Sequence, residues 1–183
     1  MLRRILYVPR CLPGFPGGGG TVGEVVTSAG VEELAARLRR AGKRLVLTNG
    51  CFDLLHVGHL RYLAAAKALG DVLLVGVNAD EEVRRQKGPS RPFVPATERV
   101  ELVAGLVPVD YAFIFTEPTA TGLVLAIRPD VYAKGGDYNP ANLPEMSAVT
   151  TVGARLVFLP FVAGRSTTEL AMLIAGRLGA NGV

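Results

Sequence analysis

Five short apolar segments alternate with segments of helical periodicity along this chain, and that alternation most constrains its fold. The expected strands cover residues 44–49, 71–78, 110–115, 130–134 and 154–160. The expected helices cover residues 28–43, 57–70, 97–106, 119–128 and 167–178. Because strands that are buried on both faces are apolar at most positions, the pattern predicts a parallel sheet covered by helices on both sides. We therefore expect a single α/β domain with a mostly parallel, five-stranded sheet.

The composition suits a chain with one buried core and no membrane span. Hydrophobic residues make up 49% and charged residues 20% of the 183 residues, as in globular domains. No apolar run approaches the ~20 residues that a membrane span requires, and prolines interrupt the apolar patch near the N-terminus. Two cysteines, Cys11 and Cys51, are too few for a disulfide framework. We expect a cytoplasmic protein that does not associate with membranes.

The N-terminal segment differs from the rest of the chain in composition and charge. Residues 1–21 are rich in glycine and proline, which predicts a flexible leader ahead of a domain at 22–183. Residues 1–44 hold 8 Lys/Arg and 3 Asp/Glu, whereas residues 45–183 hold 12 and 13. The expected body is therefore nearly neutral, although the net charge of the whole chain is +4. A nucleic-acid-binding face needs clustered positive charge on the folded domain, so we expect no nucleic-acid partner.

Chemically informative side chains follow the ends of the expected strands. They fall within residues 48–59, 78–87, 134–138 and 165–168. Open α/β sheets bind their ligands outside the carboxyl ends of the strands. The four groups are therefore expected to share one ligand site.

Two histidines, His56 and His59, stand three residues apart in "HVGH" and are the only histidines of the chain. In a helix, residues at this spacing share one face, and Gly58 leaves room for a ligand to approach the backbone. Free N–H groups at a helix N-terminus favour anions, so imidazoles there can donate hydrogen bonds to a phosphate. The same spacing also suits two buried core histidines, or a metal site with Cys51 as a further ligand. The residues alone leave these three interpretations open.

The segments around the histidines resemble the cytidylyltransferase-like nucleotidyltransferase superfamily. "TNGCFDLLHVGHLRYLAAAKALGD" contains the superfamily's His-x-Gly-His signature at the start of the first Rossmann helix. "VGVNADEEVRRQKGPSRPFVPATERVELVAGLVPVDYAFIF", "RPDVYAKGGDY" and "GRSTTEL" follow in the family's order and spacing. The Thr-Asn-Gly-Cys-Phe-Asp opening and the Lys-Gly-Gly-Asp-Tyr block point, within the superfamily, to the ADP-heptose synthase type. The resemblance covers roughly residues 25–178 and implies a Rossmann-like nucleotidyltransferase domain.

The resemblance implies a reaction in which an acceptor phosphate attacks the α-phosphate of ATP and pyrophosphate leaves, with CTP as the alternative nucleotide. The acceptor of the ADP-heptose synthase type is D-glycero-D-manno-heptose 1-phosphate, so the product is an ADP-heptose. Mg²⁺ is implied with the triphosphate, but the sequence gives no set of metal ligands. The resemblance also implies a separate sugar kinase that phosphorylates the heptose, and a homo-oligomer, most simply a dimer.

The resemblance gives each matching residue a role. His56, His59 and Lys87 are the expected catalytic residues, which stabilise the transferred phosphate. The residues expected to bind the nucleotide lie at strand ends and helix starts: Thr48, Asn49, Gly50, Cys51, Phe52, Gly58, Lys134, Gly135, Gly136, Asp137, Ser166, Thr167 and Thr168. The residues expected to bind the acceptor or position a loop are Asp53, Asn78, Asp80 and Arg91.

Several of these residues also have an ordinary structural explanation. Asp53 fits a turn or a helix N-cap as well as it fits a ligand contact. Ser166 suits the start of any helix, and a basic surface loop would explain Lys87 and Arg91. Arg165 stands where many relatives carry Ile, His or Tyr, so the resemblance assigns it no role.

Three other functions are compatible with parts of the sequence. The first is a cytidylyltransferase or adenylyltransferase for another phosphorylated acceptor, such as glycerol 3-phosphate. The second is a fragment of a class I aminoacyl-tRNA synthetase, but the chain is short and "PEMSA" lacks the lysines of the corresponding loop. The third is a nucleotide-binding regulator without catalysis, although such a protein has no need of both histidines, Lys87 and the Ser-Thr-Thr block.

Overall fold

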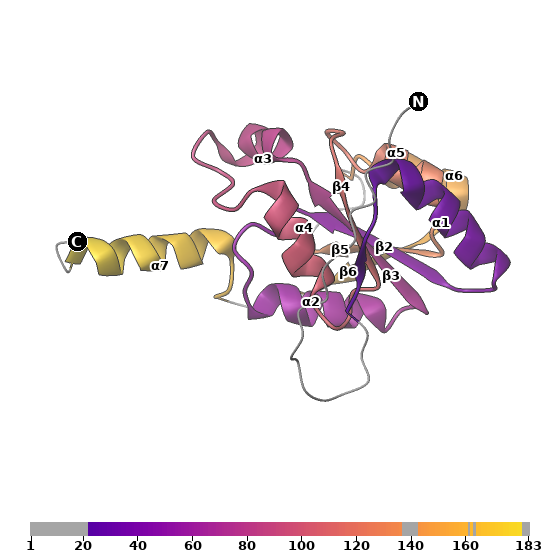
Figure 1. Ribbon diagram of the computed structural model, residues 1–183, viewed down its shortest axis with the longest axis horizontal. Helices are drawn as coiled ribbons and strands as arrows, with labels where there is room; N and C mark the ends of the chain where they lie inside the picture. Colours follow the sequence, from indigo (N-terminus) through magenta and orange to yellow (C-terminus); the bar gives the residue numbers. More distant parts are fainter. Residues whose placement is uncertain (1–21, 137–142, 161, 163, 181–183) are drawn as a thin grey trace, which may run out of the picture.

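The computed structural model describes residues 22–136, 143–160, 162 and 164–180 (Figure 1). The expected leader at 1–21 and Asp137 lie outside these residues. The strands are β1 (Glu24–Val25), β2 (Leu45–Gly50), β3 (Val72–Asn78), β4 (Tyr111–Phe115), β5 (Val131–Gly135) and β6 (Arg155–Leu159). The helices are α1 (Ser28–Arg40), α2 (Val57–Lys67), α3 (Asp80–Lys87), α4 (Ala96–Ala104), α5 (Thr121–Ile127), α6 (Met146–Val152) and α7 (Thr167–Ala180).

All strands belong to one parallel sheet with the order β1-β4-β3-β2-β5-β6. The predicted α/β class and parallel sheet are confirmed, but the sheet has six strands instead of five. The additional strand, β1, has two residues and pairs with β4 at the sheet edge. A pair of residues is too short to show a strand pattern. The residue before this strand, Gly23, runs close to the chain before β4: a Cβ on Gly23 would lie 2.5 Å from the Val109 carbonyl oxygen.

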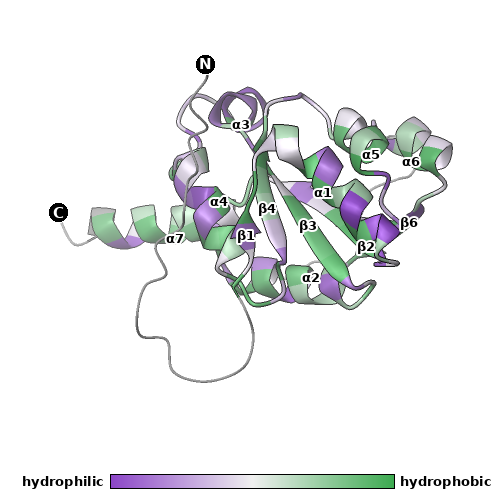
Figure 2. Ribbon diagram, turned by 45° about the vertical axis from the view of Figure 1, so that its right-hand side comes forward, coloured by the Kyte–Doolittle hydropathy of each residue, from purple (hydrophilic) through white to green (hydrophobic). Residues whose placement is uncertain are grey.

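Two hydrophobic cores lie on the two faces of the sheet. One joins α1, α5 and α6 to alternate strand residues, among them Leu45 and Leu74. The other joins α2 and α4 to the strand residues between these, such as Val46 and Val75. Because successive residues of a strand point to opposite faces, both sets must be apolar, and Figure 2 shows β3 as largely hydrophobic. The expectation of helices on both faces is confirmed.

Two short helices, α3 and α6, were not predicted from the sequence. Helix α3 is polar except for Val83, so it shows no apolar stripe. It ends at Lys87, which the sequence suggested as part of a loop, because Gly88 follows with a φ of 98°. Among the helices of the described residues, none is long and apolar enough to cross a membrane.

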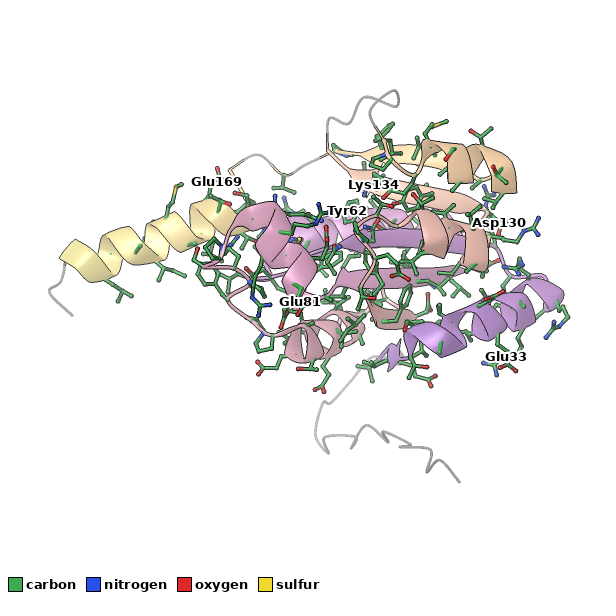
Figure 3. The ribbon with its side chains drawn as sticks, turned by 90° about the horizontal axis from the view of Figure 1, so that it is seen from above. Glu33, Tyr62, Glu81, Asp130, Lys134 and Glu169 are labelled. Atoms are coloured by element: carbon green, nitrogen blue, oxygen red, sulfur yellow. The ribbon has the colours of Figure 1, made fainter. Side chains whose placement is uncertain are left out.

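The chain reverses its direction of travel across the sheet between β2 and β5. From β2 it proceeds to β3 and β4, and then returns to β5 and β6 on the other side. Open α/β sheets bind ligands at such a switch point, outside the carboxyl ends of the strands. Figure 3 shows Glu169 on the carboxyl side of the strands and Asp130 on the opposite side. The crevice at the ends of β2 and β5 is therefore the place to look for a site.

A single buried guanidinium fixes this edge of the sheet. Arg99 of α4 has no exposed surface, and its Nη atoms donate to the carbonyl oxygens of Cys51 and Asn78 and to the Asp80 carboxylate. Its Nε donates to the Val94 carbonyl oxygen at 2.8 Å. The guanidinium thus connects the ends of β2 and β3 with the loop before α4. Nothing in the sequence pattern indicates this role for Arg99.

We expect Arg99→Met to lower the free energy of unfolding by about 3 kcal/mol, because it leaves buried carbonyls and the Asp80 carboxylate without their donor. Arg84→Met is the matched control, since Arg84 is an exposed residue of α3. Its loss should cost no more than about 1 kcal/mol. Urea denaturation of the two variants measures the difference, and equal losses would contradict the role given to Arg99.

Candidate active site

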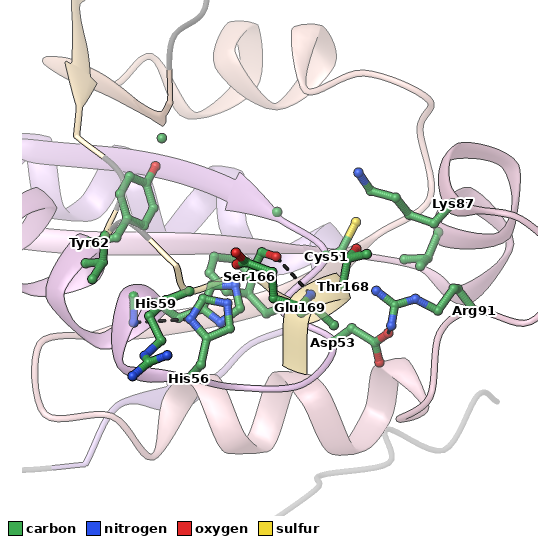
Figure 4. A pocket seen from close by; sticks show the side chains of 18 of the residues that line it. Cys51, Asp53, His56, His59, Tyr62, Lys87, Arg91, Ser166, Thr168 and Glu169 are labelled. Atoms are coloured by element: carbon green, nitrogen blue, oxygen red, sulfur yellow. Dashed lines mark hydrogen bonds and ion pairs between the residues drawn. The ribbon is translucent and has the colours of Figure 1, made fainter. Parts of the chain in front are cut away.

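A cavity of about 510 Å³ opens at the carboxyl ends of β2 and β5. Its walls come from the turn after β2, the first turn of α2, the end of α3 with the loop that follows, the end of β5 and the first turn of α7. Figure 4 shows His56 and His59 on one side of the view, Lys87 and Arg91 on the other, and Ser166 and Thr168 between them. The volume is in the range of small-molecule sites. The predicted convergence of the strand-end segments is therefore observed.

The turn after β2 forms the floor of the cavity. Phe52 lies there with a φ of 47°, in the left-handed region that residues with a side chain seldom adopt. A Cβ on Gly50 would meet the Phe52 ring at 3.2 Å, so glycine allows this ring to fold against the strand end. Non-glycine residues in this region cost free energy and cluster at functional sites. The surrounding bonds, including that from Arg99 to the Cys51 carbonyl, hold the turn in place.

His56 caps α2 with its own side chain. Its Nδ1 accepts a hydrogen bond from the Gly58 N–H at 3.1 Å, so the ring proton of neutral His56 is on Nε2. A Cβ on Gly58 would lie 2.8 Å from that Nδ1. The glycine therefore makes room for the imidazole, whereas the sequence suggested that it makes room for a ligand. This explains in physical terms why glycine separates the two histidines.

His59 stacks on His56 with the ring centroids 3.9 Å apart. Burial, with a smaller effect of His56, lowers the pKa of His59 to about 4. Burial and the nearby Arg165 also lower the pKa of His56, against an opposing effect of Glu169. Both imidazoles are therefore neutral near pH 7. His59 Nδ1 is buried and has no hydrogen-bond partner within the part of the chain that the structure describes.

Asp53 holds the loop that carries Arg91. Its Oδ1 accepts hydrogen bonds from the N–H groups of Phe93 and Val94, at 2.8 and 3.0 Å, and its Oδ2 lies 3.1 Å from Arg91 Nη1. The Arg91 guanidinium also lies 4.3 Å from the centroid of the Phe93 ring. Of the two roles open to Asp53, these bonds favour loop positioning. Lys87, at the end of α3, adds a second cation to this wall.

Lys134 supplies a cation at the end of β5. Its Nζ donates to Asn49 Oδ1 at 3.3 Å, and the same oxygen accepts a hydrogen bond from the Tyr132 hydroxyl at 2.7 Å. Burial lowers the pKa of Lys134, while the charge of Glu145 raises it. Asn49 and Lys134 are thus held together across the switch point of the sheet. Cys51 lies close by, and burial raises the pKa of its thiol, which is therefore protonated near neutral pH.

The first turn of α7 closes the cavity. Ser166 Oγ accepts a hydrogen bond from the Glu169 N–H at 3.1 Å, which is the helix cap that the sequence offered as the structural explanation. The hydroxyl proton of Ser166 remains able to donate to a ligand. Thr167 Oγ1 lies 3.4 Å from the Leu54 carbonyl oxygen and ties α7 to the turn after β2. Arg165 lines the cavity just ahead of this helix.

Most of the residues that the sequence singled out line this cavity, and a few do not. Those that line it are Asn49, Gly50, Cys51, Phe52, Asp53, His56, Gly58, His59, Lys87, Arg91, Lys134, Gly135, Ser166, Thr167 and Thr168. Thr48 is buried and bonded to Tyr62, and the Gly136 N–H donates to the Leu159 carbonyl oxygen. Asn78 and Asp80 bind Arg99, and Asp80 also accepts the Ala96 N–H. These four lie outside the cavity lining.

Apart from Arg165, six lining residues were given no role by the sequence analysis: Tyr62, Val83, Pro160, Val162, Gly164 and Glu169. Tyr62 is three residues after His59 in α2, so helical spacing placed it on the same face. Its hydroxyl lies 2.5 Å from Thr48 Oγ1 and donates to the Ala133 carbonyl oxygen, which joins α2 to β2 and β5. Glu169 completes a Ser-x-x-Glu capping sequence and could have been found from that spacing.

The sequence of this chain matches a known protein family and several curated proteins. The sequence model of the cytidylyltransferase-like family matches residues 47–151. The bifunctional protein HldE of Trichlorobacter lovleyi is 46% identical over 140 residues, which cover 76% of this chain and 28% of that protein. HldE of Geobacter metallireducens is 48% identical over 129 residues, which cover 70% and 26%. HldE of Vibrio atlanticus is 42% identical over 155 residues, which cover 85% and 33%.

A solved structure agrees with the fold. It is that of the lipopolysaccharide core biosynthesis protein from Thermoplasma volcanium, with a TM-score of 0.55 and 30% sequence identity. The match covers 66% of this chain and 98% of that one. In contrast, this chain spans only about a third or less of the length of the curated HldE relatives named above.

We expect acid to destabilise the protein through His59. Its pKa is about 4 in the fold against the ordinary 6.5, so between these values the unfolded chain binds more protons. The contribution of His59 is complete above pH 6.5 and falls as the pH drops towards 4, by at most about 1 kcal/mol per pH unit. Denaturant unfolding of the protein and of His59→Asn, above and below pH 6.5, measures this. Identical pH profiles would contradict the neutral, buried state of His59.

Proposed function

Because the chain belongs to the cytidylyltransferase-like family, we propose that it is a nucleotidyltransferase that transfers AMP from ATP to a sugar 1-phosphate. The proposed acceptor is D-glycero-D-manno-heptose 1-phosphate, and the products are an ADP-heptose and pyrophosphate. One observation carries the proposal: two stacked imidazoles face the same cavity as Lys87 and Lys134. Such an arrangement suits a polyphosphate whose negative charge increases during the reaction.

Two helix N-termini and several cations would bind the phosphates. Helices α2 and α7 both begin at the cavity, and free N–H groups with the helix dipole favour anions there. Lys87 adds a point charge, and the Thr168 hydroxyl adds a donor. Phosphoryl and nucleotidyl transfers depend on positioning and charge stabilisation rather than on covalent catalysis. The cavity therefore has the groups that this type of reaction needs.

The two histidines would act as neutral hydrogen-bond donors before the nucleotide arrives. His56 Nδ1 is occupied by the Gly58 N–H, so Nε2 carries the proton that can be donated to a phosphate oxygen. A bound polyphosphate favours the protonated imidazole and would raise the pKa of both rings. The site thus gains positive charge when the negative charge enters it. Because both rings are neutral in the free protein, no two stacked imidazolium ions repel each other before the ligand binds.

Arg91 and Lys134 would hold the parts of the substrates on either side of the reacting phosphorus. Asp53 fixes Arg91 at a distance of 3.1 Å, and Asn49 fixes Lys134 at 3.3 Å. Because both cations are positioned before binding, little side-chain entropy is lost when a phosphate reaches them. The acceptor also carries a phosphate, so the site needs more positive charge than a nucleotide alone requires.

Nucleotidyltransferases of this kind use Mg²⁺ with the triphosphate, and the cavity fits a metal that is bound by the nucleotide. No group of three or more metal-ligating side chains occurs in the described ranges, and Asp53 is engaged with its loop and Arg91. Mg²⁺ keeps several waters and takes few protein ligands beside phosphate oxygens. Lys87, Thr168 and the start of α7 would hold the complex, in which the metal neutralises phosphate charge.

The acceptor assignment rests on the relatives. The family match and the HldE proteins support nucleotidyl transfer, and the Thermoplasma volcanium protein is named for lipopolysaccharide core biosynthesis. The HldE proteins are called bifunctional, and this chain matches about a third or less of their length. A heptose with a phosphate at its anomeric carbon must come from a sugar kinase. We propose that this kinase reaction precedes nucleotidyl transfer.

An activity matrix tests the proposal and separates it from its alternatives. ATP and CTP are each combined with heptose 1-phosphate and with glycerol 3-phosphate in the presence of Mg²⁺, and pyrophosphate release is measured. We expect release only with ATP and the heptose 1-phosphate, and a fall of about 100- to 1,000-fold in His59→Ala because a group at the reacting phosphate is lost. Nucleotide binding without release for any pair would favour a regulator, and full activity of His59→Ala would contradict the mechanism.

Lys87 and Arg84 provide a matched test of the basic wall. Both are exposed residues on the same side of α3, three positions apart, but only Lys87 is among the cavity-lining residues. We expect Lys87→Ala to lower kcat/KM for ATP by about 10- to 100-fold, as the loss of a charge-assisted hydrogen bond does. Arg84→Ala should leave it unchanged. Equal effects of the two variants would contradict a specific contact of Lys87 with ATP and would leave only the general positive charge of α3.

A further inference from the structure

Two polar side chains stand side by side where β2 and β5 end, at the switch point of the sheet. Leu47 of β2 pairs with Tyr132 of β5, so Asn49 and Lys134, two residues further along each strand, lie on the same face of the sheet. Both side chains line the cavity. Tyr132 has no exposed surface, and its ring centroid lies 5.6 Å from Lys134 Nζ. We refer to Asn49, Tyr132 and Lys134 as the switch-point cluster.

The hydrogen bonds of the switch-point cluster fix the orientation of the Asn49 amide. An ammonium group can donate but cannot accept, so the Asn49 atom that lies 3.3 Å from Lys134 Nζ must be the oxygen, Oδ1. The Tyr132 hydroxyl, 2.7 Å from the same oxygen, must therefore be a donor as well. Asn49 Nδ2 makes no hydrogen bond within the described residues and is not a buried atom. Its two N–H groups are thus open to the cavity that Asn49 lines.

We propose that the switch-point cluster binds the phosphate of the acceptor, with Asn49 and Lys134 as the contacting residues and Tyr132 as a positioning residue. The amide N–H groups and the ammonium present donors and a positive charge, which match the negatively charged oxygens of a phosphate. This inference rests on the proposed nucleotidyl transfer and assigns one part of the cavity to the second substrate. The resemblance to the family implied nucleotide contacts for Asn49 and Lys134, and the geometry favours a different assignment.

The distribution of charge in the cavity favours the acceptor over ATP as the ligand of the cluster. Lys87 and the first turns of α2 and α7 lie on other walls, where they suit the triphosphate. The remainder of ATP is adenosine, which carries no charge and whose base presents donors as well as acceptors. A phosphate monoester carries about −1.5 to −2 charges at neutral pH. The partly buried ammonium of Lys134 therefore gains more from the acceptor phosphate than from adenosine.

Tyr132 would act on the acceptor without touching it. Lys134 determines which end of the Asn49 amide faces inwards, and the Tyr132 hydroxyl holds that amide in position. The hydroxyl is itself held, because the Tyr132 ring is packed in the hydrophobic core that includes residues of α1, α5 and α6. Donors that are ordered before binding lose little side-chain entropy when a ligand arrives.

Asn49→Asp tests the assignment with an almost isosteric change. Aspartate keeps an oxygen for the bonds from Tyr132 and Lys134, but it replaces the two N–H donors with a second, negatively charged oxygen. We expect KM for heptose 1-phosphate to rise about 30- to 100-fold, while KM for ATP changes by less than about threefold. A purely structural role of Asn49 would leave both constants unchanged, and an equal rise of both would assign the cluster to ATP. Either result would overturn the proposal.

Tyr132→Phe tests the positioning role, because it removes the hydroxyl and keeps the buried ring. We expect KM for heptose 1-phosphate to rise about 3- to 10-fold, as the loss of one neutral hydrogen bond does. In an Asn49→Ala background the same change should have no further effect, because the residue through which Tyr132 acts is gone. Equal effects in both backgrounds would contradict this role.

Tyr111→Phe is the matched control for Tyr132→Phe. Tyr111 belongs to β4 of the same sheet, and its side chain does not line the cavity. Its hydroxyl makes no hydrogen bond within the part of the chain that the structure describes. The control should therefore leave KM for both substrates unchanged. A rise in the acceptor KM equal to that of Tyr132→Phe would show that the effect is not specific to the cluster.

A binding titration separates failure of this inference from failure of the proposed function. Heptose 1-phosphate is titrated by calorimetry into the protein with Mg²⁺ and α,β-methylene-ATP, which cannot release pyrophosphate. We expect Asn49→Asp to weaken acceptor binding about 30- to 100-fold, and this result would support the inference even if no substrate pair gave turnover. Turnover by the unchanged protein together with equal acceptor binding by the variant would overturn the inference and leave the function intact. Absence of acceptor binding to the unchanged protein would also overturn the inference.

Discussion

The site depends on one buried guanidinium that serves three chain segments at once. Arg99 donates to the carbonyl oxygens after β2 and at the end of β3, and to the loop before α4. Those carbonyls lie where β2 and β3 end, and in a buried position they need a donor such as this guanidinium. A charged group can stay buried here because each of its three nitrogens donates a hydrogen bond to at least one oxygen. The hydrogen bond from Arg99 to the Cys51 carbonyl oxygen stabilises the turn formed by residues 50–53.

Several groups that would bind substrate already serve the structure of the free protein. His56 caps α2, Ser166 caps α7, and Asp53 orders the loop of Arg91. His56 and Ser166 each use one atom in this bond and leave another for a ligand, whereas both oxygens of Asp53 are engaged and Asp53 acts through Arg91. The cost of ordering these side chains is thereby met on folding rather than on binding. The structural and functional explanations that the sequence offered for Ser166 are thus compatible.

The sequence predicted the layers of the fold and most of the residues that line the cavity. It did not predict the side chains that connect the strand ends to the neighbouring loops. The strands were predictable because they are buried on both faces, which leaves a continuous apolar signal. Short elements such as β1, α3 and α6 have too few residues to show a period. Arg99 looks in the sequence like any surface arginine of an amphipathic helix, and only the tertiary structure brings three carbonyls to it. Asn78 and Asp80 follow a strand end as a ligand residue would, but they bind Arg99.

The contrast between α2 and α7 shows how the two helices that begin at the cavity are supported. Helix α2 packs Leu63 and Ala66 into a core and is tied to β2 and β5 through the Tyr62 hydroxyl. Helix α7 leaves several apolar residues exposed, and the Thr167 hydroxyl in its first turn bonds to the turn after β2. A phosphate wall that is anchored at one end only would move with the helix that carries it. The geometry of the cavity therefore depends on how the first turn of α7 is held against the turn after β2.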